Sequence, residues 1–461
     1  MVIDMNLDTV KSQLRSCGVV GAGGAGFPSY AKLDARADTI ILNCAECEPL
    51  LTLHRQVLAQ YADEILCALD LLADAVGASE IAVAVKASYT EAVRALQERL
   101  SAHTRARIAI LPEVYPAGDE VVTIYEATGR VVRPGSLPIS EGVIVYNVET
   151  MKNAYDALTH NKPVTHKYVT ITGAVKRACT LLLPLGMRLD AAVAMAGGES
   201  VPDAVYINGG PMTGNIVARS SVVTKTTNAV IVLPPSHPLL LQKQTNFSVD
   251  LHRAMSVCCQ CQMCTDLCPR NQLGHPIEPH AFMRALAAGA YHADGGERRV
   301  ETAPLLNAMF CCSCGVCEHY ACMQSLSPRT LIAAYKAELR KNGVKVPTDA
   351  PLQPVSAMRQ WRQVPKERLT ARLGLEEYAA AAPIVDAVPV VKTLTVLLSQ
   401  HIGAPAVPVV AAGDSVVAGQ CIARAAEGAL GVDIHAPVSG TVTAVSDRDI
   451  CIEADRKEAN V

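Results

Sequence analysis

Two cysteine runs constrain the fold of this chain more than any other feature. The first run reads Cys258-x2-Cys261-x2-Cys264-x3-Cys268-Pro269, and the second reads Cys311-x2-Cys314-x2-Cys317-x4-Cys322. Three thiolates at x2, x2 spacing can hold three corners of one cubane, while the cysteine before a proline reaches a different cluster. The spacing therefore predicts a helical, ferredoxin-like module built around two [4Fe-4S] clusters.

The predicted ligand sets cross between the two runs. The first cysteine set is Cys258, Cys261, Cys264 and Cys322, and the second cysteine set is Cys311, Cys314, Cys317 and Cys268. The second run ends in x4-Cys-Met where the first ends in x3-Cys-Pro, so the spacing defines Cys322 less well than the other ligands. Structural zinc sites are the alternative, but they need two C-x2-C pairs and leave the third regular cysteine of each run unexplained. The spacing favours iron-sulfur clusters.

The composition indicates a globular protein with several domains. The chain has 461 residues, of which 50% are apolar, and a formal charge of -3, so its charge gives no reason to expect nucleic acid as a partner. A chain of this length usually forms about two to four domains. No apolar stretch reaches the roughly 18 residues of a membrane span, and the first residues lack the pattern of a secretory signal. We therefore expect a soluble cytoplasmic protein without a membrane span.

Five segments differ in their patterning. At the start, apolar strand-like runs alternate with helical stretches, among them a strand predicted over 40–46 and a helix predicted over 58–76, which indicates a mostly parallel sheet covered by helices. The fold class is therefore multidomain α/β. The predicted segments are a Rossmann-like domain over 1–162, a small α+β module over 163–245, the two-cluster module over 246–340, a linker with a helix over 341–390 and a compact all-β domain over 391–461.

A glycine-rich loop lies near the N-terminus. Its glycines are Gly21, Gly23, Gly24 and Gly26, and Phe27 follows them. The bare backbone of such a loop can approach a phosphate closely and donate N–H groups to it. The loop fits G-x-G-x-x-G formally, yet the strand before it is short, and a tight helix–strand contact explains the glycines equally well. The loop alone leaves both interpretations open.

Polar side chains follow the strand predicted over 40–46. Asn43, Glu46 and Glu48 lie where this strand ends, and open α/β sheets bind ligands at such strand ends. Carboxylates at this place suit the hydroxyls of a ribose or the N–H groups of a ring. A solvated loop whose glutamates stabilise a helix N-terminus is the alternative.

Four motifs in this order resemble the flavin domain of the Rnf complex C subunit and, more distantly, of the NADH-oxidising flavoprotein subunit of respiratory complex I. They are the glycine loop, Asn43-x-Ala45-Glu46-x-Glu48-Pro49, Tyr115-Pro116-x-Gly118-x-Glu120 and Asn147-Val148-Glu149-Thr150. The resemblance implies FMN contacts at Gly21, Gly23, Gly24, Gly26, Lys32, Asn43, Glu46 and Asn147. It implies a nicotinamide nucleotide near Phe27 and Glu48, with Gly118 and Glu120 in the same binding site.

We assign no side chain as acid, base or nucleophile, because the protein's part is to position and tune its cofactors. Ala45 stands where complex I has an aspartate, and Asp119 stands where it has a glutamate. The resemblance therefore supports FMN binding more firmly than direct binding of NADH.

The remaining segments extend the resemblance over nearly the whole chain. Residues 167–215 resemble a soluble-ligand-binding β-grasp (SLBB) domain, and the cysteine runs resemble the ferredoxin module of the same Rnf protein. Residues 391–461 resemble a barrel-sandwich hybrid domain without the Met-Lys-Met hairpin of a lipoyl or biotinyl carrier, so we expect a structural role for it. In the Rnf protein this domain precedes the flavin domain, whereas here it comes last.

This domain order resembles that of the cobalamin reductases of propanediol-utilisation microcompartments. The resemblance implies NADH as the electron donor, FMN and two [4Fe-4S] clusters as the relay, and cobalamin or a corrinoid adenosyltransferase as the acceptor. It also implies a shell protein as a partner and a place in a bacterial microcompartment. Two alternatives stay open: an electron-input subunit of a membrane-bound Rnf-type complex, and a non-enzymatic electron conduit at a microcompartment shell.

Overall fold

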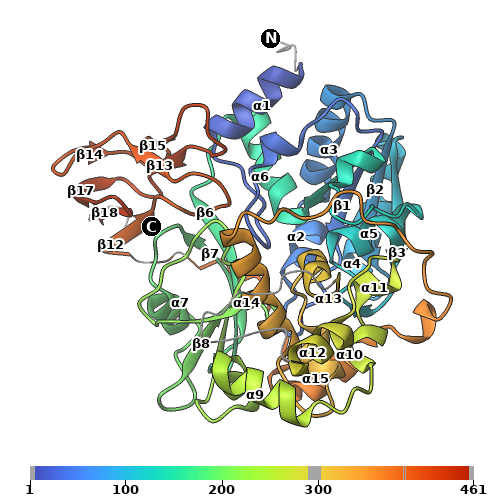
Figure 1. Cartoon of the computed structure of the whole chain (residues 1–461). Coiled ribbons are helices and arrows are strands. Elements are labelled where there is room, and N and C mark those ends of the chain that lie inside the picture. The colour runs from blue at the N-terminus through green and yellow to red at the C-terminus, as the bar shows by residue number, and fades with distance from the viewer. Residues whose placement is uncertain (1–5, 245, 289–302, 388, 390, 456–461) are drawn as a thin grey trace.

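The computed structural model describes residues 6–244, 246–288, 303–387, 389 and 391–455 of the chain (Figure 1). Residues 1–5, 245, 289–302, 388, 390 and 456–461, which fall in all five predicted segments, lie outside the described residues. Two sheets, a helical module and a closing β domain follow one another along the chain.

The first sheet is parallel throughout, in the order β3-β2-β1-β5. Its strands are β1 (Thr39–Cys44), β2 (Glu80–Lys86), β3 (Ala106–Leu111) and β5 (Val143–Asn147). One apolar core joins the sheet to α1 (Leu7–Ser16), α2 (Leu53–Gln60), α3 (Ala62–Val76), α4 (Thr90–Gln97) and α6 (Val148–His160), and a second core joins it to α5 (Glu120–Thr128). The prediction of a parallel sheet covered by helices is confirmed.

The helix predicted over 58–76 is wrong in its extent. The structure divides this region into α2 and α3, with Tyr61 between them at φ -122° and ψ 31°. The hydroxyl of Tyr61 lies 2.9 Å from that of Tyr168 in the next module. Apolar residues keep the same spacing across the break because both helices pack on the same core. The spacing therefore does not reveal where one helix ends and the next begins.

The strand order places a topological switch point between β1 and β5. From β1 the chain continues through β2 and β3 on one side, and β5 joins on the other side. Asn43 of β1 and Asn147 of β5 are register partners at the carboxyl ends of these strands. Ligands of open α/β sheets bind at this position.

The second sheet has the order β7-β6-β10-β8-β9 and is mixed, since β10 runs parallel to β6 and the other pairs are antiparallel. Its core also contains residues of α7 (Leu189–Met195). The strands are β6 (His166–Gly173), β7 (Cys179–Pro184), β8 (Val205–Asn208), β9 (Asn215–Val217) and β10 (Ala229–Leu233). The turn between β8 and β9 reaches the segment that follows β1, where Thr213 contacts Glu48.

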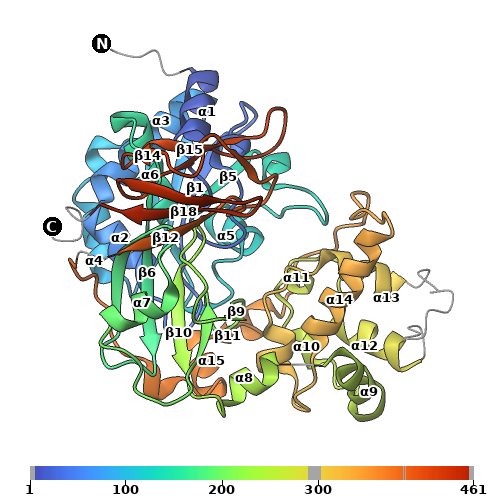
Figure 2. The ribbon, with the colours of Figure 1, turned by 90° about the vertical axis from the view of Figure 1, so that its left-hand side faces the viewer.

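The cysteine runs lie in a helical module that stands beside the two sheets (Figure 2). Phe282 packs edge-on against Tyr335 in its core, with ring centroids 5.7 Å apart. The helices are α8 (Pro238–Lys243), α9 (Phe247–Val257), α10 (Met263–Asp266), α11 (Pro269–Gln272), α12 (Pro279–Ala287), α13 (Ala303–Leu306), η5 (Val316–Ala321) and α14 (Pro328–Lys341). Within the described ranges, no helix is both long and apolar enough to cross a membrane.

The segment predicted as a linker returns to the first domain. Its strand β11 (Val364–Pro365) pairs antiparallel with β4 (Val114–Tyr115), and α15 (Lys366–Arg372) follows directly. This pairing fixes the segment against the Tyr115-Pro116 motif, next to the strand ends of the first sheet.

The closing domain consists of two small sheets, ordered β12-β18-β17-β14 and β13-β15-β16. It packs on the first domain and the second module, where buried Lys225 donates through Nζ to the carbonyls of Gly18 (2.7 Å) and Asp433 (3.1 Å). Its strands are β12 (Thr393–Leu397), β13 (Ala406–Pro408), β14 (Ser415–Val416), β15 (Cys421–Ala425), β16 (Ile434–His435), β17 (Gly440–Val445) and β18 (Asp449–Ala454).

Candidate functional site

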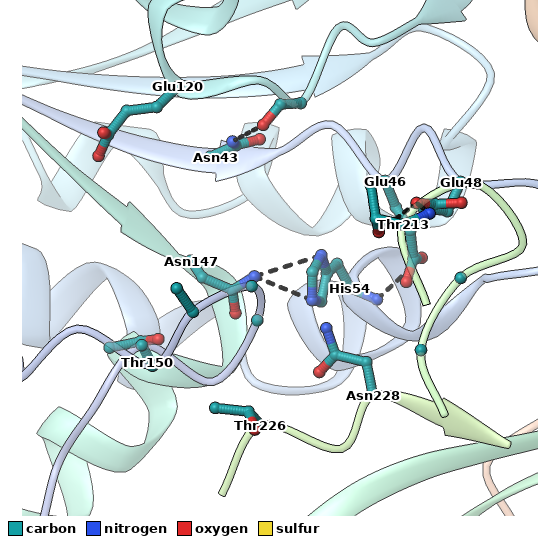
Figure 3. A pocket seen from close by; sticks show the side chains of 18 of the residues that line it. Asn43, Glu46, Glu48, His54, Glu120, Asn147, Thr150, Thr213, Thr226 and Asn228 are labelled. Atoms are coloured by element: carbon teal, nitrogen blue, oxygen red, sulfur yellow. Dashed lines mark hydrogen bonds between the residues drawn. The ribbon is translucent and has the colours of Figure 1, made fainter. Parts of the chain in front are cut away.

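A cavity of about 720 Å³ lies at the carboxyl ends of β1 and β5, and we call it the strand-end pocket (Figure 3). Its walls come from the glycine loop, from the ends of both strands and from the β8–β9 turn of the second module. Every residue predicted to bind FMN or the nicotinamide nucleotide lines it: Gly21, Gly23, Gly24, Gly26, Phe27, Lys32, Asn43, Glu46, Glu48, Gly118, Glu120 and Asn147. Sequence reasoning from separate motifs thus converges on one cavity.

The glycine loop is a closed hairpin that precedes β1. The N–H of Gly21 donates to the carbonyl of Phe27 (2.9 Å), and the N–H of Ala22 donates to Oγ1 of Thr150 (2.9 Å) at the start of α6. Gly24 and Gly26 have φ of +72° and +71°, a region that L side chains rarely adopt. Since the loop follows α1 rather than a strand of the sheet, it is not the strand–loop–helix unit of a Rossmann dinucleotide motif.

Asn43 and Glu46 form the rim at the end of β1. The amide of Asn43 is engaged at both ends, because Nδ2 donates to the carbonyl of Gly118 (3.0 Å) and Oδ1 accepts from the N–H of Ala45 (3.0 Å). Oε2 of Glu46 accepts from the N–H of His54 (3.1 Å), whereas Oε1 is buried and has no hydrogen-bond partner among the described residues. A buried acceptor of this kind needs a donor, and the hydroxyls and ring N–H of FMN can supply one. The residues present therefore fit the flavin.

Glu48 connects the strand end to the second module. Oε2 accepts from the N–H of Met212 (2.8 Å), and Oε1 accepts from the N–H (3.0 Å) and hydroxyl (2.6 Å) of Thr213. Burial raises the pKa of the Glu48 carboxyl, and these hydrogen bonds oppose that shift. Its contact with a nicotinamide nucleotide stays a prediction, but in this structure both oxygens hold the β8–β9 turn against the strand-end pocket.

Replacing Glu48 by alanine is expected to destabilise the fold by about 2 kcal/mol, because the N–H of buried Met212 and the two donors of Thr213 lose a charged acceptor. A lower melting temperature in circular dichroism would measure this loss. Glu376→Ala is the matched control, since Glu376 is exposed in the first turn of a short helix. Equal melting temperatures for the two variants would contradict the role of Glu48.

Two further polar pairs face the strand-end pocket. Nζ of Lys32 lies 2.8 Å from Oε1 of Glu120 and also donates to the carbonyl of Val145 (2.9 Å). Nδ2 of Asn147 lies 2.9 Å from Nε2 of His54. An ammonium beside a glycine-rich loop is suited to a phosphate, so these side chains and the loop supply the donors that a flavin nucleotide needs.

Sequence reasoning missed several residues of the strand-end pocket. Thr150 belongs to the Asn147-Val148-Glu149-Thr150 motif, so the sequence does contain a signal for it. For His54 and for the second module's residues no sequence signal pointed to the pocket. Polar residues among those missed are His54, Thr150, Asn208, Thr213, Thr226 and Asn228.

The predicted cluster ligands gather around two small cavities of the helical module. One is lined by all four members of the first cysteine set and the other by all four members of the second. The off-repeat cysteines Cys259 and Cys312 lie beside the first and second sets respectively. The crossed arrangement expected from the spacing is therefore present in the fold, and the assignment of each thiol as a ligand stays a prediction.

The loops that begin at Cys258 and at Cys311 have left-handed residues at the same two positions. Residues two and four positions after the first cysteine of each loop have positive φ: Gln260 (56°) and Gln262 (63°) in one, Ser313 (59°) and Gly315 (83°) in the other. Such left-handed residues turn the chain sharply enough to direct successive thiols inwards. The repeat of this pattern indicates two equivalent cradles.

A π-helix explains the longer gap before Cys322. Cys264 lies in α10, an α-helical turn, whereas η5 (Val316–Ala321), which contains Cys317, is a π-helix. A π turn holds roughly one residue more than an α turn. Cys268 (φ -71°, ψ 116°) and Cys322 (φ -74°, ψ 112°) consequently leave their turns with the same backbone conformation.

The thiols also fit iron-sulfur clusters electrostatically. Burial, with neighbouring cysteines adding to it, raises the pKa of Cys264 and of Cys268 to about 12. Four thiolates could not share either cavity without positive charge between them, and the iron of a cluster provides it.

Family models match the chain along its length. Residues 14–156 match the Nuo51 FMN-binding domain, 168–215 the SLBB domain, 257–327 the 4Fe-4S dicluster domain and 375–459 the RnfC barrel sandwich hybrid domain. These matches confirm the predicted fold class and the predicted cofactors, FMN and two [4Fe-4S] clusters.

The cobalamin reductase PduS of Salmonella typhimurium is 42% identical to this chain over 98% of the chain and 97% of the relative. The chain belongs to the PduS cobalamin reductase family. A component of the Na(+)-translocating ferredoxin:NAD(+) oxidoreductase complex of Acetobacterium woodii is 31% identical over 58% of the chain and 59% of that component. The crystal structure of an NAD+-reducing [NiFe]-hydrogenase in the H2-reduced state aligns with a TM-score of 0.48 and 18% identity, over 77% of this chain and 65% of that one. This PduS family member is a flavin and iron-sulfur electron-transfer oxidoreductase.

In this PduS family member the second cysteine set adjoins the strand-end pocket. The hydroxyl of Tyr115 donates to the carbonyl of Cys314 (2.6 Å). Arg270, which lines the cavity of the second cysteine set, donates through a guanidinium nitrogen to Asp119 (2.9 Å), the residue between Gly118 and Glu120 of the strand-end pocket. The two binding sites are therefore connected through Asp119 and Arg270.

Proposed function

We propose that this chain oxidises NADH at the strand-end pocket and delivers the electrons to cobalamin through its two cysteine sets. One observation carries the proposal: the pocket that collects every predicted flavin residue is connected to the second cysteine set by the hydrogen bond from Arg270 to Asp119. FMN held in the strand-end pocket would supply a hydride acceptor and the clusters would supply one-electron carriers, so together they would convert the two-electron chemistry of NADH to one-electron transfer.

The chain's own residues bind and position these groups. The glycine loop and Lys32 offer donors to a phosphate, Glu46 offers a buried acceptor, and Phe27 presents a half-buried ring at the pocket wall. A volume of about 720 Å³ lies in the upper part of the range of small-molecule pockets, which supports a nicotinamide ring entering beside the flavin.

The burial of the cysteines supports a direction for the electrons. Cys268 and Cys317 of the second cysteine set are buried, whereas Cys261 of the first set is exposed. The first set also lies among exposed apolar side chains of the module, including Met323, which is 69% exposed. We place the electron entry at the second cysteine set and the exit at the first, where an acceptor can approach.

The acceptor in this proposal is cobalamin, free or held by a corrinoid adenosyltransferase. The long match to a cobalamin reductase, over 98% of this chain against 58% for the Rnf-type relative, supports it over an Rnf-type role. A place in a bacterial microcompartment, with a shell protein as partner, belongs to the same proposal.

The test is anaerobic purification of the full chain with flavin and iron assays, followed by NADH-driven reduction of cobalamin in the visible spectrum. We expect FMN, two clusters per chain and reduction that depends on NADH. Protein without flavin would refute the proposal. Oxidation of NADH with an artificial acceptor but not with cobalamin would refute the corrinoid part alone.

A further inference from the structure

Two side-chain amides converge on one point above the glycine loop. A Cβ placed on Gly23 would lie 3.0 Å from Nδ2 of Asn228 and 3.1 Å from Nδ2 of Asn147. Asn147 ends β5 of the first domain, whereas Asn228 directly precedes β10 of the second module. Figure 3 shows both side chains at the strand-end pocket, reaching it from different parts of the chain.

The orientation of both amides is fixed by what their oxygens accept. Oδ1 of Asn147 accepts from the N–H of Glu149 (3.0 Å), and Oδ1 of Asn228 accepts from Nζ of Lys167 (2.9 Å). An ammonium group and a backbone N–H are donors only, so each must face an amide oxygen and not an amide nitrogen. The two NH2 groups therefore face the strand-end pocket as donors, without relying on which way an amide is drawn.

A buried ion pair links the two amides. Glu149 and Lys167 are each 1% exposed, and Nζ of Lys167 contacts Oε2 of Glu149. Oε1 of Glu149 accepts from the N–H of Tyr168 (3.0 Å), and Nζ also donates to the carbonyl of Tyr168 (3.1 Å). Burying two charges is costly unless their hydrogen bonds are satisfied. Here the hydrogen bonds of both charged groups are satisfied. The pair fixes the position of Asn147 through the backbone of Glu149 and that of Asn228 through Lys167.

We propose that Asn228 is a further flavin-binding residue, which donates with Asn147 to an acceptor oxygen of the flavin nucleotide, and that the Glu149–Lys167 pair positions both amides. One hydrogen of the Asn147 amide is directed at Nε2 of His54, 2.9 Å away, and the second is available to the ligand. The second module then completes the flavin site. The proposal rests on FMN occupying the strand-end pocket, as in the proposed function.

The experiment measures flavin affinity rather than turnover. The full chain is stripped of flavin and titrated with FMN while the quenching of FMN fluorescence is followed. Asn228→Ala is expected to raise the dissociation constant by roughly 10-fold or more, as expected for the loss of a hydrogen bond in a buried site. Asn228→Asp keeps an oxygen for Lys167 but has no N–H, so it separates donation to the flavin from support of Lys167. We expect Asn228→Asp to weaken binding at least as much as Asn228→Ala.

Asn342→Ala is the matched control, since Asn342 is exposed at the end of α14. Melting temperatures monitor folding of each variant. Parallel titrations with riboflavin locate the acceptor oxygen: equal losses for riboflavin and FMN place it on the ring or ribityl chain, and a loss confined to FMN places it on the phosphate. Both results support the proposal.

Wild-type affinity in Asn228→Asp would overturn the proposal. If Asn147→Ala weakens FMN binding while both Asn228 variants do not, this inference fails and the proposed function stands. If the wild-type chain binds no FMN, both fail.

Discussion

Replacing Cys268 by alanine is expected to remove the cluster that the second cysteine run binds, although Cys268 belongs to the first run in the sequence. Cys268 lines the same cavity as Cys311, Cys314 and Cys317. Losing one of four thiolates from a buried site leaves a cubane with an open iron, and such clusters are lost easily. About half of the iron should disappear, the FMN content should stay, and electron delivery to cobalamin should fall to background. Iron and flavin assays with anaerobic spectroscopy measure these changes.

The identity of the surviving cluster tests the crossed pairing. The reduced electron paramagnetic resonance spectrum of Cys268→Ala should match that of Cys317→Ala and differ from that of Cys264→Ala. Cys259→Ala is the control, because Cys259 is exposed and off the repeat, and it should keep all of its iron. A Cys268→Ala spectrum that matches Cys264→Ala instead would show that each run binds its own cluster.

The spacing of the cysteines predicts part of the structure of the cysteine module, but not all of it. The x2, x2 pattern predicted which thiols gather, because three closely spaced ligands must lie on one short loop. The x4 gap before Cys322 could not be interpreted from the sequence, since nothing in Val316–Ala321 distinguishes a π turn from an α turn. The difference lies in backbone hydrogen bonding that the fold imposes on the segment.

Some residues of the strand-end pocket could be predicted from the sequence, and others could not. Motif residues from four separate segments were expected at one site, and the parallel register of β1 and β5 brings Asn43 beside Asn147. Asn228 and Thr213 could not be expected there, because their place depends on how the second module docks. Glu48 makes that contact, so a residue expected to touch the nucleotide also joins two domains.

The contact between Asp119 and Arg270 makes the two cofactor sites structurally dependent on each other. Asp119 N-caps α5 through hydrogen bonds to Val121 and Val122, and it also accepts from Arg270 of the cysteine module. Gly118 and Glu120 on either side of it line the strand-end pocket. A displacement of the cysteine module would therefore move Asp119, and with it the neighbouring residues that line the flavin site. This rigidity suits electron transfer, which needs the two groups held at a constant separation.

Replacing Gly23 by valine is expected to abolish stable FMN binding, with a rise of at least about 100-fold in the dissociation constant, or roughly 3 kcal/mol. The new Cβ would lie about 3.0 Å from the amide nitrogens that face the strand-end pocket, so the side chain would fill the space between loop and donors. Gly23 belongs to the glycine loop, and the atoms nearest to its added Cβ are those of Asn228 and Asn147, so the iron content should remain and the purified protein should show cluster absorbance without flavin absorbance. Gly77→Asn is the control, because Gly77 ends α3 in open space with a φ of +79°, which asparagine tolerates. Flavin retained at wild-type affinity in Gly23→Val would mean that the nucleotide binds elsewhere than above the glycine loop.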